Sequence, residues 1–416
     1  MGEMRQATVV GAGIVGVCAA LSLLEKGFAV RVVDPDPPAD GASYGNAGVI
    51  SCWACVPQAV PGIWKNVPKW LLDPEGPIFL RPAYALRALP WALKFFRAGA
   101  ADRVPAIADA MLALNHPTID LYRGHLAGTG RDDLVRDSCY VHVFRDPAMA
   151  DLNRYEWRLR AERGVPLRRV DAGELHEIEP DLSPDYTAGI LVERQARAVD
   201  PGGLGKVLAE KAASLGAEFL RARARRLIPR EGGGCAVETD GAAGTVEADI
   251  VVLAAGAWSA RLLAPLGVTV PLEAEHGYHM IMRDPGVTAN NSVLDMGHKF
   301  VASTMSMGLR CAGTVEFAGL DAAPNYARAR VFERLAKRLF PAVNTADTEE
   351  WRGTRPSFPD SLPCIGPVPG HPSIITAFGH GHLGLTMGPK TGQLVAALAA
   401  GETPNMDMAP YRVDRF

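Results

Sequence analysis

Thr8-Val-Val-Gly11-Ala-Gly13-Ile-Val-Gly16, near the start of the chain, decides the fold. This stretch predicts a buried strand, a glycine-rich turn and the start of an apolar helix that runs to Leu24. Gly11 permits a tight turn, Gly13 lets backbone amides approach a pyrophosphate, and Gly16 lets the helix pack closely on the strands. A phosphate at the turn would lie at the positive end of the helix dipole. The spacing is typical of a dinucleotide-binding βαβ unit.

The second strand of this unit ends in an acidic residue. Residues 28–33 follow the helix stop at Gly27, and Asp34 comes next. A carboxylate at this position can accept hydrogen bonds from a ribose diol and would repel a 2′-phosphate. The segment therefore favours FAD or NAD over NADP. A glycine-rich turn in an α/β protein that binds no nucleotide is the alternative.

Three further stretches favour a flavin over a nicotinamide. The loop Ser43-Tyr-Gly-Asn46-Ala47-Gly48 follows Asp34 closely enough to fold back over the cofactor. Residues 250–258 predict a buried parallel strand ending in Ala255-Gly256, small residues that let a backbone approach the same cofactor. Near the C-terminus we expect a strand at 373–378, a loop over Gly379-His-Gly381-His382-Leu383-Gly384 and a helix at 385–400. The N-terminal amides of that helix suit the pyrimidine edge of a flavin.

Composition limits the classes of partner. The chain has 416 residues, a formal net charge of -3, and one dense cationic stretch at residues 221–226, so nucleic acid is not an expected partner. We find neither a signal-peptide layout nor an apolar run long enough to span a membrane, which predicts a cytoplasmic protein. The seven cysteines are expected as free thiols, and Cys52-Trp-Ala-Cys55 lacks a second pair at zinc spacing, so no metal site is expected.

With these motifs the chain resembles the D-amino acid dehydrogenase small-subunit type of the glycine oxidase and D-amino acid oxidase superfamily. Trp351-Arg-Gly-Thr-Arg355-Pro356, Pro359-Asp360 and Thr386-Met387 carry the resemblance further. It implies an α/β fold, in which a Rossmann-like FAD-binding domain is interleaved with an α+β substrate domain that contains an antiparallel sheet. The expected bounds are 1–85, 198–262 and 361–416 for the first domain, and 86–197 and 263–360 for the second. Short β-like patterns at 140–144, 189–192, 276–282 and 299–303, and an amphipathic helix at 325–339, agree with such a substrate domain.

The resemblance also implies a substrate carboxylate bound by Arg355. A guanidinium holds a carboxylate through two parallel hydrogen bonds, which also fixes the rotation of the Cα–H bond. A structural salt bridge is the alternative role for Arg355, and Arg352 is its nearest competitor. Tyr278, in Gly277-Tyr278-His279, matches a strand that projects a tyrosine toward the substrate. The chain departs from the dehydrogenase pattern at His276, where that pattern has a lysine.

The remaining candidates complete the two sets of site residues. His279, His298 and His382 join Arg355 and Tyr278 as candidates for catalysis or substrate binding. FAD is expected to bind without a covalent bond, because no cysteine matches the position used by covalent relatives, and Cys364 lies in an expected strand leading to Gly366. The cofactor candidates are Gly11, Gly13, Ile14, Val15, Gly16, Asp34, Ser43, Asn46, Ala47, Gly48, Arg225, Ala255, Gly256, Gly381, His382, Leu383, Gly384 and Thr386.

The expected reaction is FAD-dependent oxidative deamination of a D-amino acid to the 2-keto acid and ammonia, by hydride transfer from Cα. Three alternatives stay open: oxidation of a cyclic or N-substituted amino acid such as a D-hydroxyproline or sarcosine, a non-catalytic FAD or electron-transfer subunit, and an NAD-dependent dehydrogenase. The electron acceptor is expected to be a quinone of the respiratory chain or dioxygen. Residues 53–97, rich in Trp, Pro, Leu and basic side chains, predict either a packed lid or a peripheral contact with the inner face of the cell membrane.

Overall fold

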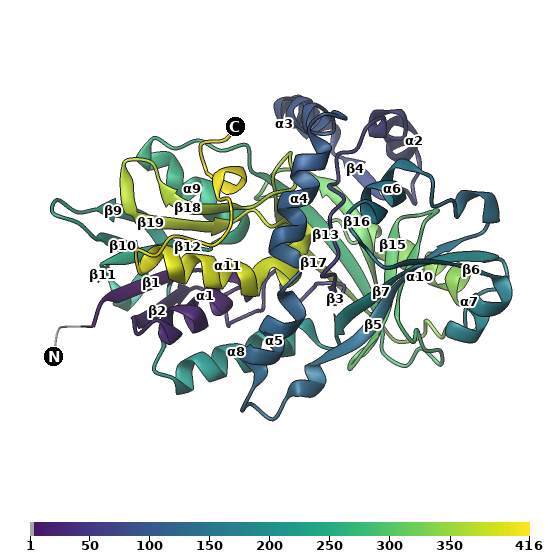
Figure 1. Cartoon of the computed structure of the whole chain (residues 1–416), viewed down its shortest axis with the longest axis horizontal. Helices are drawn as coiled ribbons and strands as arrows, with labels where there is room; N and C mark the ends of the chain where they lie inside the picture. The colour runs from purple at the N-terminus through teal and green to yellow at the C-terminus, as the bar shows by residue number, and fades with distance from the viewer. Residues whose placement is uncertain (1–3) are drawn as a thin grey trace.

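The computed structural model describes residues 4–416 and is organised around two large sheets, one in each lobe of the molecule (Figure 1). The glycine-rich turn belongs to the six-stranded sheet, where β1 pairs in parallel with β12 on one side and β2 on the other. The edge strand β18 is antiparallel to β19. In spatial order the strands are β18 (Cys364–Val368), β19 (His371–Phe378), β12 (Ile250–Leu253), β1 (Gln6–Val10), β2 (Ala29–Asp34) and β8 (Glu218–Arg221).

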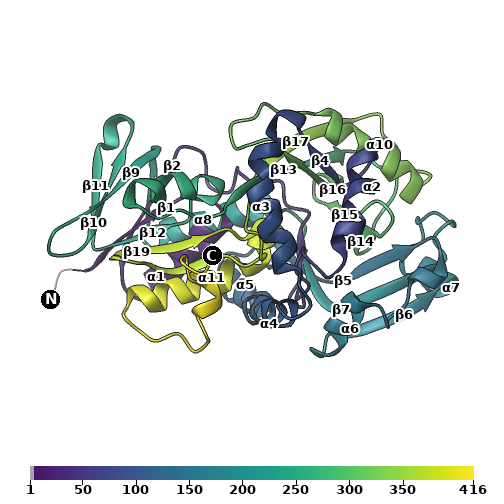
Figure 2. The ribbon, with the colours of Figure 1, turned by 90° about the horizontal axis from the view of Figure 1, so that it is seen from above.

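Both faces of this sheet are covered, which explains why β12 is an unbroken apolar run and why β1 is buried from Ala7 to Val10. On one face α1 (Ile14–Glu25) packs against α11 (Gly384–Ala399). The two helices approach closely because a Cβ on Gly392 would lie 2.5 Å from the carbonyl oxygen of Cys18. On the other face lies a three-stranded sheet of β9 (Ala224–Pro229), β10 (Cys235–Thr239) and β11 (Thr245–Ala248), which projects at the end of the lobe (Figure 2).

The ten-stranded sheet forms the second lobe and contains all four strands expected in the substrate domain. They lie within β5, β7, β13 and β15, so that prediction is confirmed. Most neighbours are antiparallel, whereas β14 pairs in parallel with β5 and β4 with β16. The path is β17 (Thr348–Ser357), β13 (Glu273–Met282), β16 (Gly308–Phe317), β15 (Phe300–Met305), β14 (Ser292–Asp295), β5 (Val135–Phe144), β7 (Ala188–Ala198) and β3 (Val49–Ile50), with β4 (Ile78–Leu80) and β6 (Leu167–Asp171) paired to β16 and β7.

Helices cover the remaining surfaces. The amphipathic helix expected at 325–339 is α10 (Ala327–Leu339), whose apolar side chains share a core with β13 and β16. The other helices are α2 (Val67–Leu72), α3 (Ala85–Ala98), α4 (Val104–Asn115), α5 (Thr118–Leu126), α6 (Tyr155–Ala161), α7 (Ala172–Ile178), α8 (Pro201–Ser214) and α9 (Ser259–Leu263). Among residues 4–416, no helix combines the length and the apolar character needed to cross a bilayer.

Two pieces of the chain cross the domain boundary expected near residue 85. The strands β3 and β4 precede that boundary, yet both pair within the ten-stranded sheet. The helices α4 and α5 follow it, yet they pack on α11, and the hydroxyl of Tyr122 donates to the carbonyl of Leu385. The first segment of the chain therefore serves both lobes.

Candidate active site

The site is a cavity of ≈ 820 Å³ lined by residues of both large sheets. The six-stranded lobe contributes the turn after β1, the Ser43 to Gly48 loop, residues 254–256 and residues 377–385. The ten-stranded lobe contributes Arg355, Gly277 and residues of β5, β15 and β16. This volume is within the range of cavities that bind cofactors and substrates.

Close backbone packing forms the turn at one end of the cavity. Gly11 has φ +112°, and a Cβ there would lie 2.4 Å from the carbonyl oxygen of Ala254. A Cβ on Gly16 would lie 1.9 Å from the carbonyl oxygen of Gly11. The first turn of α1 is thus held directly against the strands, as the sequence predicts.

The N-terminus of α1 is open to a ligand. Gly13 is its N-cap and supplies no side-chain cap, whereas the N–H of Ile14 donates to Ser43 Oγ at 2.9 Å. The other first-turn amides have no intrahelical acceptor, and Gly13, Ile14 and Val15 line the cavity. A helix N-terminus that keeps free amides beside glycine fits a pyrophosphate.

Asp34 is fixed where a ribose is expected. Its Oδ2 accepts from the N–H of Ala12 at 2.7 Å, and its Oδ1 accepts from the N–H of Asp36 at 2.8 Å. Burial raises the pKa of this carboxyl, and the two backbone N–H groups act in the opposite direction. A carboxylate held at the end of β2, next to an open helix N-terminus, fits FAD.

The loop over the cavity is held from the other lobe. Buried Arg310, on β16, donates to the carbonyl oxygens of Tyr44 at 2.8 Å and Asn46 at 2.7 Å. The side-chain carbonyl of Asn46 accepts from the N–H of Gly48 at 2.9 Å, which closes the loop on itself. The sequence gives no signal for Arg310, because its partners lie far away along the chain.

We expect Arg310→Met to weaken FAD binding as well as stability. It leaves two carbonyl groups without their charged donor, and losing such bonds costs roughly 2–4 kcal/mol of unfolding free energy. FAD affinity should fall at least about tenfold, because the loop that lines the cofactor cavity loses its anchor. Urea unfolding and FAD titration of the apoprotein measure the two effects.

Arg328→Met is the matched control for this variant. Arg328 is also buried and donates to the carbonyls of Pro74 at 2.9 Å and of Gly76, but these two residues do not line the cavity, whereas Asn46, held by Arg310, does. It should lower stability and leave FAD affinity unchanged. Equal FAD affinities for the two variants would contradict the anchoring role of Arg310.

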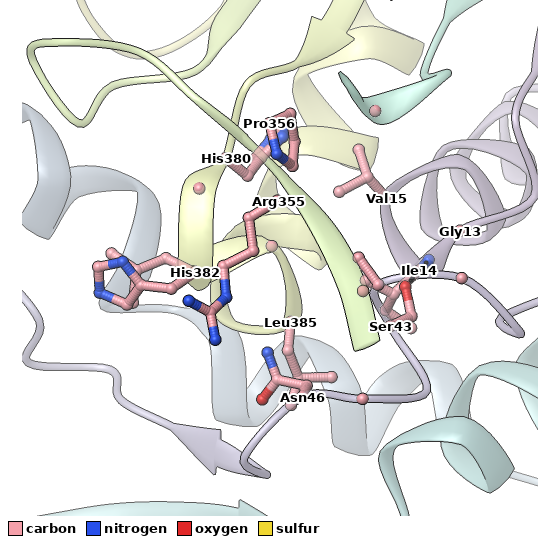
Figure 3. Close-up of a pocket in the computed structure, with 18 of the residues that line it drawn as sticks. Gly13, Ile14, Val15, Ser43, Asn46, Arg355, Pro356, His380, His382 and Leu385 are labelled. Carbon is pink, nitrogen blue, oxygen red and sulfur yellow. Dashed lines mark hydrogen bonds between the residues drawn. The ribbon is translucent and has the colours of Figure 1, made fainter. Parts of the chain in front are cut away.

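Arg355 projects into the cavity from β17. Its partner on β13 is Glu275, and Gly277 is the next residue of β13 on the same face. A Cβ on Gly277 would lie 2.4 Å from Cζ of Arg355, so the glycine leaves room for the guanidinium to lie across β13. Figure 3 shows the guanidinium pointing into the cavity between His382 and Asn46.

The charge of Arg355 is retained without an ion pair. Burial lowers its pKa and the neighbouring Glu275 carboxylate raises it, yet no carboxylate of residues 4–416 forms a salt bridge with the guanidinium. Arg352, the competitor considered above, lies on the opposite face of β17 and donates to the carbonyl of Ala322. Of the two arginines, Arg355 is the one that lines the cavity.

His382 faces Arg355 across the cavity in a neutral form. It lies in the 3-10 helix η8 (Gly381–Leu383), and its Nδ1 is 3.2 Å from the amide nitrogen of Gln58. An amide nitrogen can only donate, so Nδ1 accepts. The ring is open to the cavity but lies deep in the protein, and loss of hydration, followed by the charge of Arg355, lowers its pKa to about 4.

The structure corrects the prediction that Tyr278 lies beside Arg355. Tyr278 is 1% exposed, and its side chain is on the opposite face of β13 from Gly277. Its hydroxyl donates to the Glu316 carboxylate and accepts from the N–H of Asn325 at 2.9 Å. The residue contributes to the cavity wall, but its hydroxyl is engaged in the core beneath α10.

His279 and His298 also lie away from the substrate position. His279 is buried, stacks on Trp351 with 4.8 Å between ring centroids, and has Nδ1 3.2 Å from the carbonyl of Gly45. Burial lowers its pKa to about 3. His298 does not line the cavity, and its Nδ1 is 2.8 Å from Asp295 Oδ2. We therefore assign His279 to supporting the cofactor loop and His298 to the surface of the ten-stranded lobe.

Most of the cofactor candidates come together at the cavity. Gly16, Gly48 and Thr386 do not line it: the two glycines permit close backbone packing, and the Thr386 hydroxyl accepts from the N–H of Ser51 at 3.3 Å. Lining residues that the sequence did not indicate include Gln58, Trp351, Lys299 and Arg160. The candidates that line the cavity are Gly11, Gly13, Ile14, Val15, Asp34, Ser43, Asn46, Ala47, Arg225, Ala255, Gly256, Gly381, His382, Leu383 and Gly384.

Known proteins match the chain along its whole length. Residues 6–398 match the family described as FAD dependent oxidoreductase. The chain is 39% identical over 423 residues to a protein of Bradyrhizobium diazoefficiens named D-amino-acid oxidase, with 100% of each chain covered. It is 32% identical over 420 residues to a protein of Allorhizobium ampelinum named D-amino acid dehydrogenase, with 98% of each covered.

Solved structures show the same fold at lower identity. Glycine oxidase from Geobacillus kaustophilus superimposes with a TM-score of 0.73 at 21% identity, covering 99% of this chain and 100% of that one. Iminodiacetate oxidase from Chelativorans sp. BNC1 superimposes with a TM-score of 0.71 at 23% identity, covering 98% of each.

Proposed function

Because this chain belongs to the FAD-dependent oxidoreductase family, we propose that it oxidatively deaminates a D-amino acid at the carbon bearing the amine and the carboxylate. The observation that carries the proposal is the guanidinium of Arg355, which reaches over Gly277 into the cofactor cavity without an ion pair among residues 4–416. The full-length relatives named D-amino-acid oxidase and D-amino acid dehydrogenase support it.

In this proposal Arg355 both binds and orients the substrate. Two parallel hydrogen bonds to the carboxylate would fix the rotation about the bond to Cα and so aim the Cα–H bond. FAD, when bound, accepts the hydride from Cα, and water hydrolyses the resulting imino acid to the keto acid and ammonia. With its pKa at about 4, His382 is neutral near pH 7 and offers no second charge to compete for the carboxylate. Anaerobic bleaching of the bound FAD by D- but not L-amino acids tests the proposal.

The structure also bears on the cyclic and N-substituted amino acids considered as alternative substrates. His276, His279 and His298 are the side chains that could suit a hydroxylated ring, but the buried ring of His276 lies 3.1 Å from Thr354 Oγ1 and 2.8 Å from the carbonyl of Gly319. His279 and His298 are engaged elsewhere, as described above. A D-hydroxyproline or sarcosine therefore gains no support from these side chains.

We further propose that residues 53–97 touch a membrane and that the electron acceptor is a quinone held there. The helices α2 and α3 lie at the same edge of the molecule in Figure 1, and they face the viewer in Figure 2, where the molecule is seen from above. Leu72 is 84% exposed and Leu86 is 85% exposed, and Trp64 and Leu93 are also exposed. Apolar and tryptophan side chains, interspersed with basic residues, are typical of helices that lie in a membrane interface.

Replacing Leu72 and Leu86 together with glutamate should abolish binding to anionic phospholipid vesicles. The change removes about 3–6 kcal/mol of apolar transfer free energy and adds repulsion from the lipid charge. Co-sedimentation of the holoenzyme with vesicles measures the bound fraction. Leu215→Glu, on an exposed leucine near the end of α8, should bind as the unmodified protein does. If the double variant still sediments, or the unmodified protein does not, the contact is not a membrane surface.

A further inference from the structure

The cavity continues past Arg355 along one face of the ten-stranded sheet. From Gly277 on β13 its lining passes to Gly313 and Val315 on β16, and then to Lys299 at the start of β15. Gly277 pairs with Val315, and a Cβ on Gly313 would lie 2.7 Å from the carbonyl oxygen of Lys299, so these positions are nearly level across the sheet. Because β15 is the second strand from β13, the Lys299 backbone lies about 10 Å from that of Gly277.

Two cations meet at this far end. Lys299 adopts φ +58°, and among residues 4–416 its Nζ has only the sulfur of Met296, at 3.8 Å, within hydrogen-bonding distance. Arg160, from α6, donates to the carbonyl of Glu156 at 3.1 Å and stacks on Trp157 at 4.7 Å. Both cations line the cavity, and burial lowers the pKa of each.

No acid in the described chain neutralises this pair. Asp295 lies near Lys299, but its carboxylate accepts from His298 at 2.8 Å and from the N–H of Gly297 at 2.7 Å. The charge of Glu156 attracts both cations, without a salt bridge to either, and Arg154 repels Lys299. Lys299 and Arg160 are only partly exposed, and such cations without a salt-bridged partner are costly, so an anion bound between them would be favoured.

The neighbouring side chains suit a carboxylate ligand. Tyr140 and His142, both on β5, also line this end of the cavity. Burial raises the pKa of Tyr140 and lowers that of His142, so both are neutral hydrogen-bonding groups near pH 7. Val301, on the same strand β15 that follows Lys299, supplies an apolar wall toward Arg355, and Leu294 on β14 and Val192 on β7 add apolar walls at the far end.

We propose that Lys299 and Arg160 form a subsite for a carboxylate on the substrate's side chain, so that the enzyme prefers acidic D-amino acids, those of the aspartate and glutamate type. The inference rests on the proposed function, in which Arg355 takes the α-carboxylate. The substrate would then lie between two cationic ends of one cavity, with its methylene groups against the apolar walls.

The test compares acids with amides of the same shape in the holoenzyme. Under anaerobic conditions D-glutamate and D-aspartate should bleach the flavin with a kcat/KM at least about 100-fold above D-glutamine and D-asparagine. In Lys299→Met the values for the acids should fall at least about 30-fold, and those for the amides should change less than about threefold. Arg158→Met, on the exposed side of α6, is the control and should leave kcat/KM unchanged for both the acids and the amides.

Other results would contradict either the side-chain subsite or the proposed function. If the amides react as well as the acids, or if Lys299→Met slows both classes equally, the side-chain subsite is wrong while the proposed function stands. If no D-amino acid bleaches the flavin, the proposed function is wrong. The subsite is then judged by titrating the oxidised holoenzyme with glutarate and butyrate and following the flavin absorbance. Glutarate should bind at least about tenfold more tightly, and Lys299→Met should remove the difference; equal binding of the two overturns the subsite.

Discussion

Arg355→Met should lower kcat/KM for flavin reduction by a D-amino acid at least about 10³-fold. The variant loses a charge-assisted, two-point contact that both binds the carboxylate and fixes the rotation of the Cα–H bond. Methionine keeps most of the side-chain length and apolar contact, so the lobe should still fold. Stopped-flow bleaching under anaerobic conditions gives the rate, and the ratio of flavin to protein absorbance shows whether FAD remains bound.

Arg352→Met separates this role from a general effect on β17. Arg352 is three residues away on the same strand, but it lies on the face directed away from the cavity. Its removal should change kcat/KM less than about threefold. Comparable losses in the two variants, or an Arg355→Met enzyme that still reduces its flavin normally, would show that the carboxylate binds elsewhere.

Gly16→Ala should yield a protein that purifies without FAD. The added Cβ would lie 1.9 Å from the carbonyl oxygen of Gly11, and no side-chain rotation relieves a contact with backbone. The helix must move away from the turn, which costs roughly 1–3 kcal/mol or more and displaces the amides that would bind the pyrophosphate. FAD affinity should fall at least about 100-fold in a titration of the apoprotein.

Gly124→Ala is the matched control. Gly124 also lies within a helix, α5, and a Cβ there would meet no atom within 4 Å. Alanine is the better helix former by about 0.5–1 kcal/mol, so this variant should be equally or more stable and should bind FAD normally. A Gly16→Ala protein that retains its flavin would show that close packing at Gly16 is not required for FAD binding.

Local patterns were sufficient to predict the cofactor half of the molecule. The turn from Gly11 to Gly16, the acid at the end of β2 and the glycine loop before α11 each depend on residues close together in the chain. The strands of the second lobe also follow from short apolar patterns. These features need no knowledge of which strand pairs with which.

The substrate half could not be predicted in the same way, because it depends on which strands pair, in which register, and on which face of the sheet each side chain lies. Gly277 and Tyr278 are adjacent in a strand and so point to opposite faces of β13, but the sequence does not indicate which of the two faces borders the cavity. Only the pairing with β17 shows that Gly277 shares the face of Arg355. Lys299 and Arg160 come from segments more than a hundred residues apart, and neither position belongs to a motif. His279 and His382 were candidates because of their places beside Tyr278 and in the glycine loop, and the pKa of each is lowered in the fold, to about 3 and about 4.

The packing of α1 against α11 has a consequence for how the protein is made. A ribosome releases α11 far later than α1, so the part of the α1 surface that packs against α11 stays uncovered until that helix is made. The same holds for β12 and β19, which complete the sheet around β1 from distant parts of the chain. Contacts of such long sequence separation form slowly and leave a nascent chain prone to aggregation. The nucleotide lobe should therefore complete its fold only after β19 and α11 have been made, and chaperone supply should govern the yield of active protein in recombinant expression.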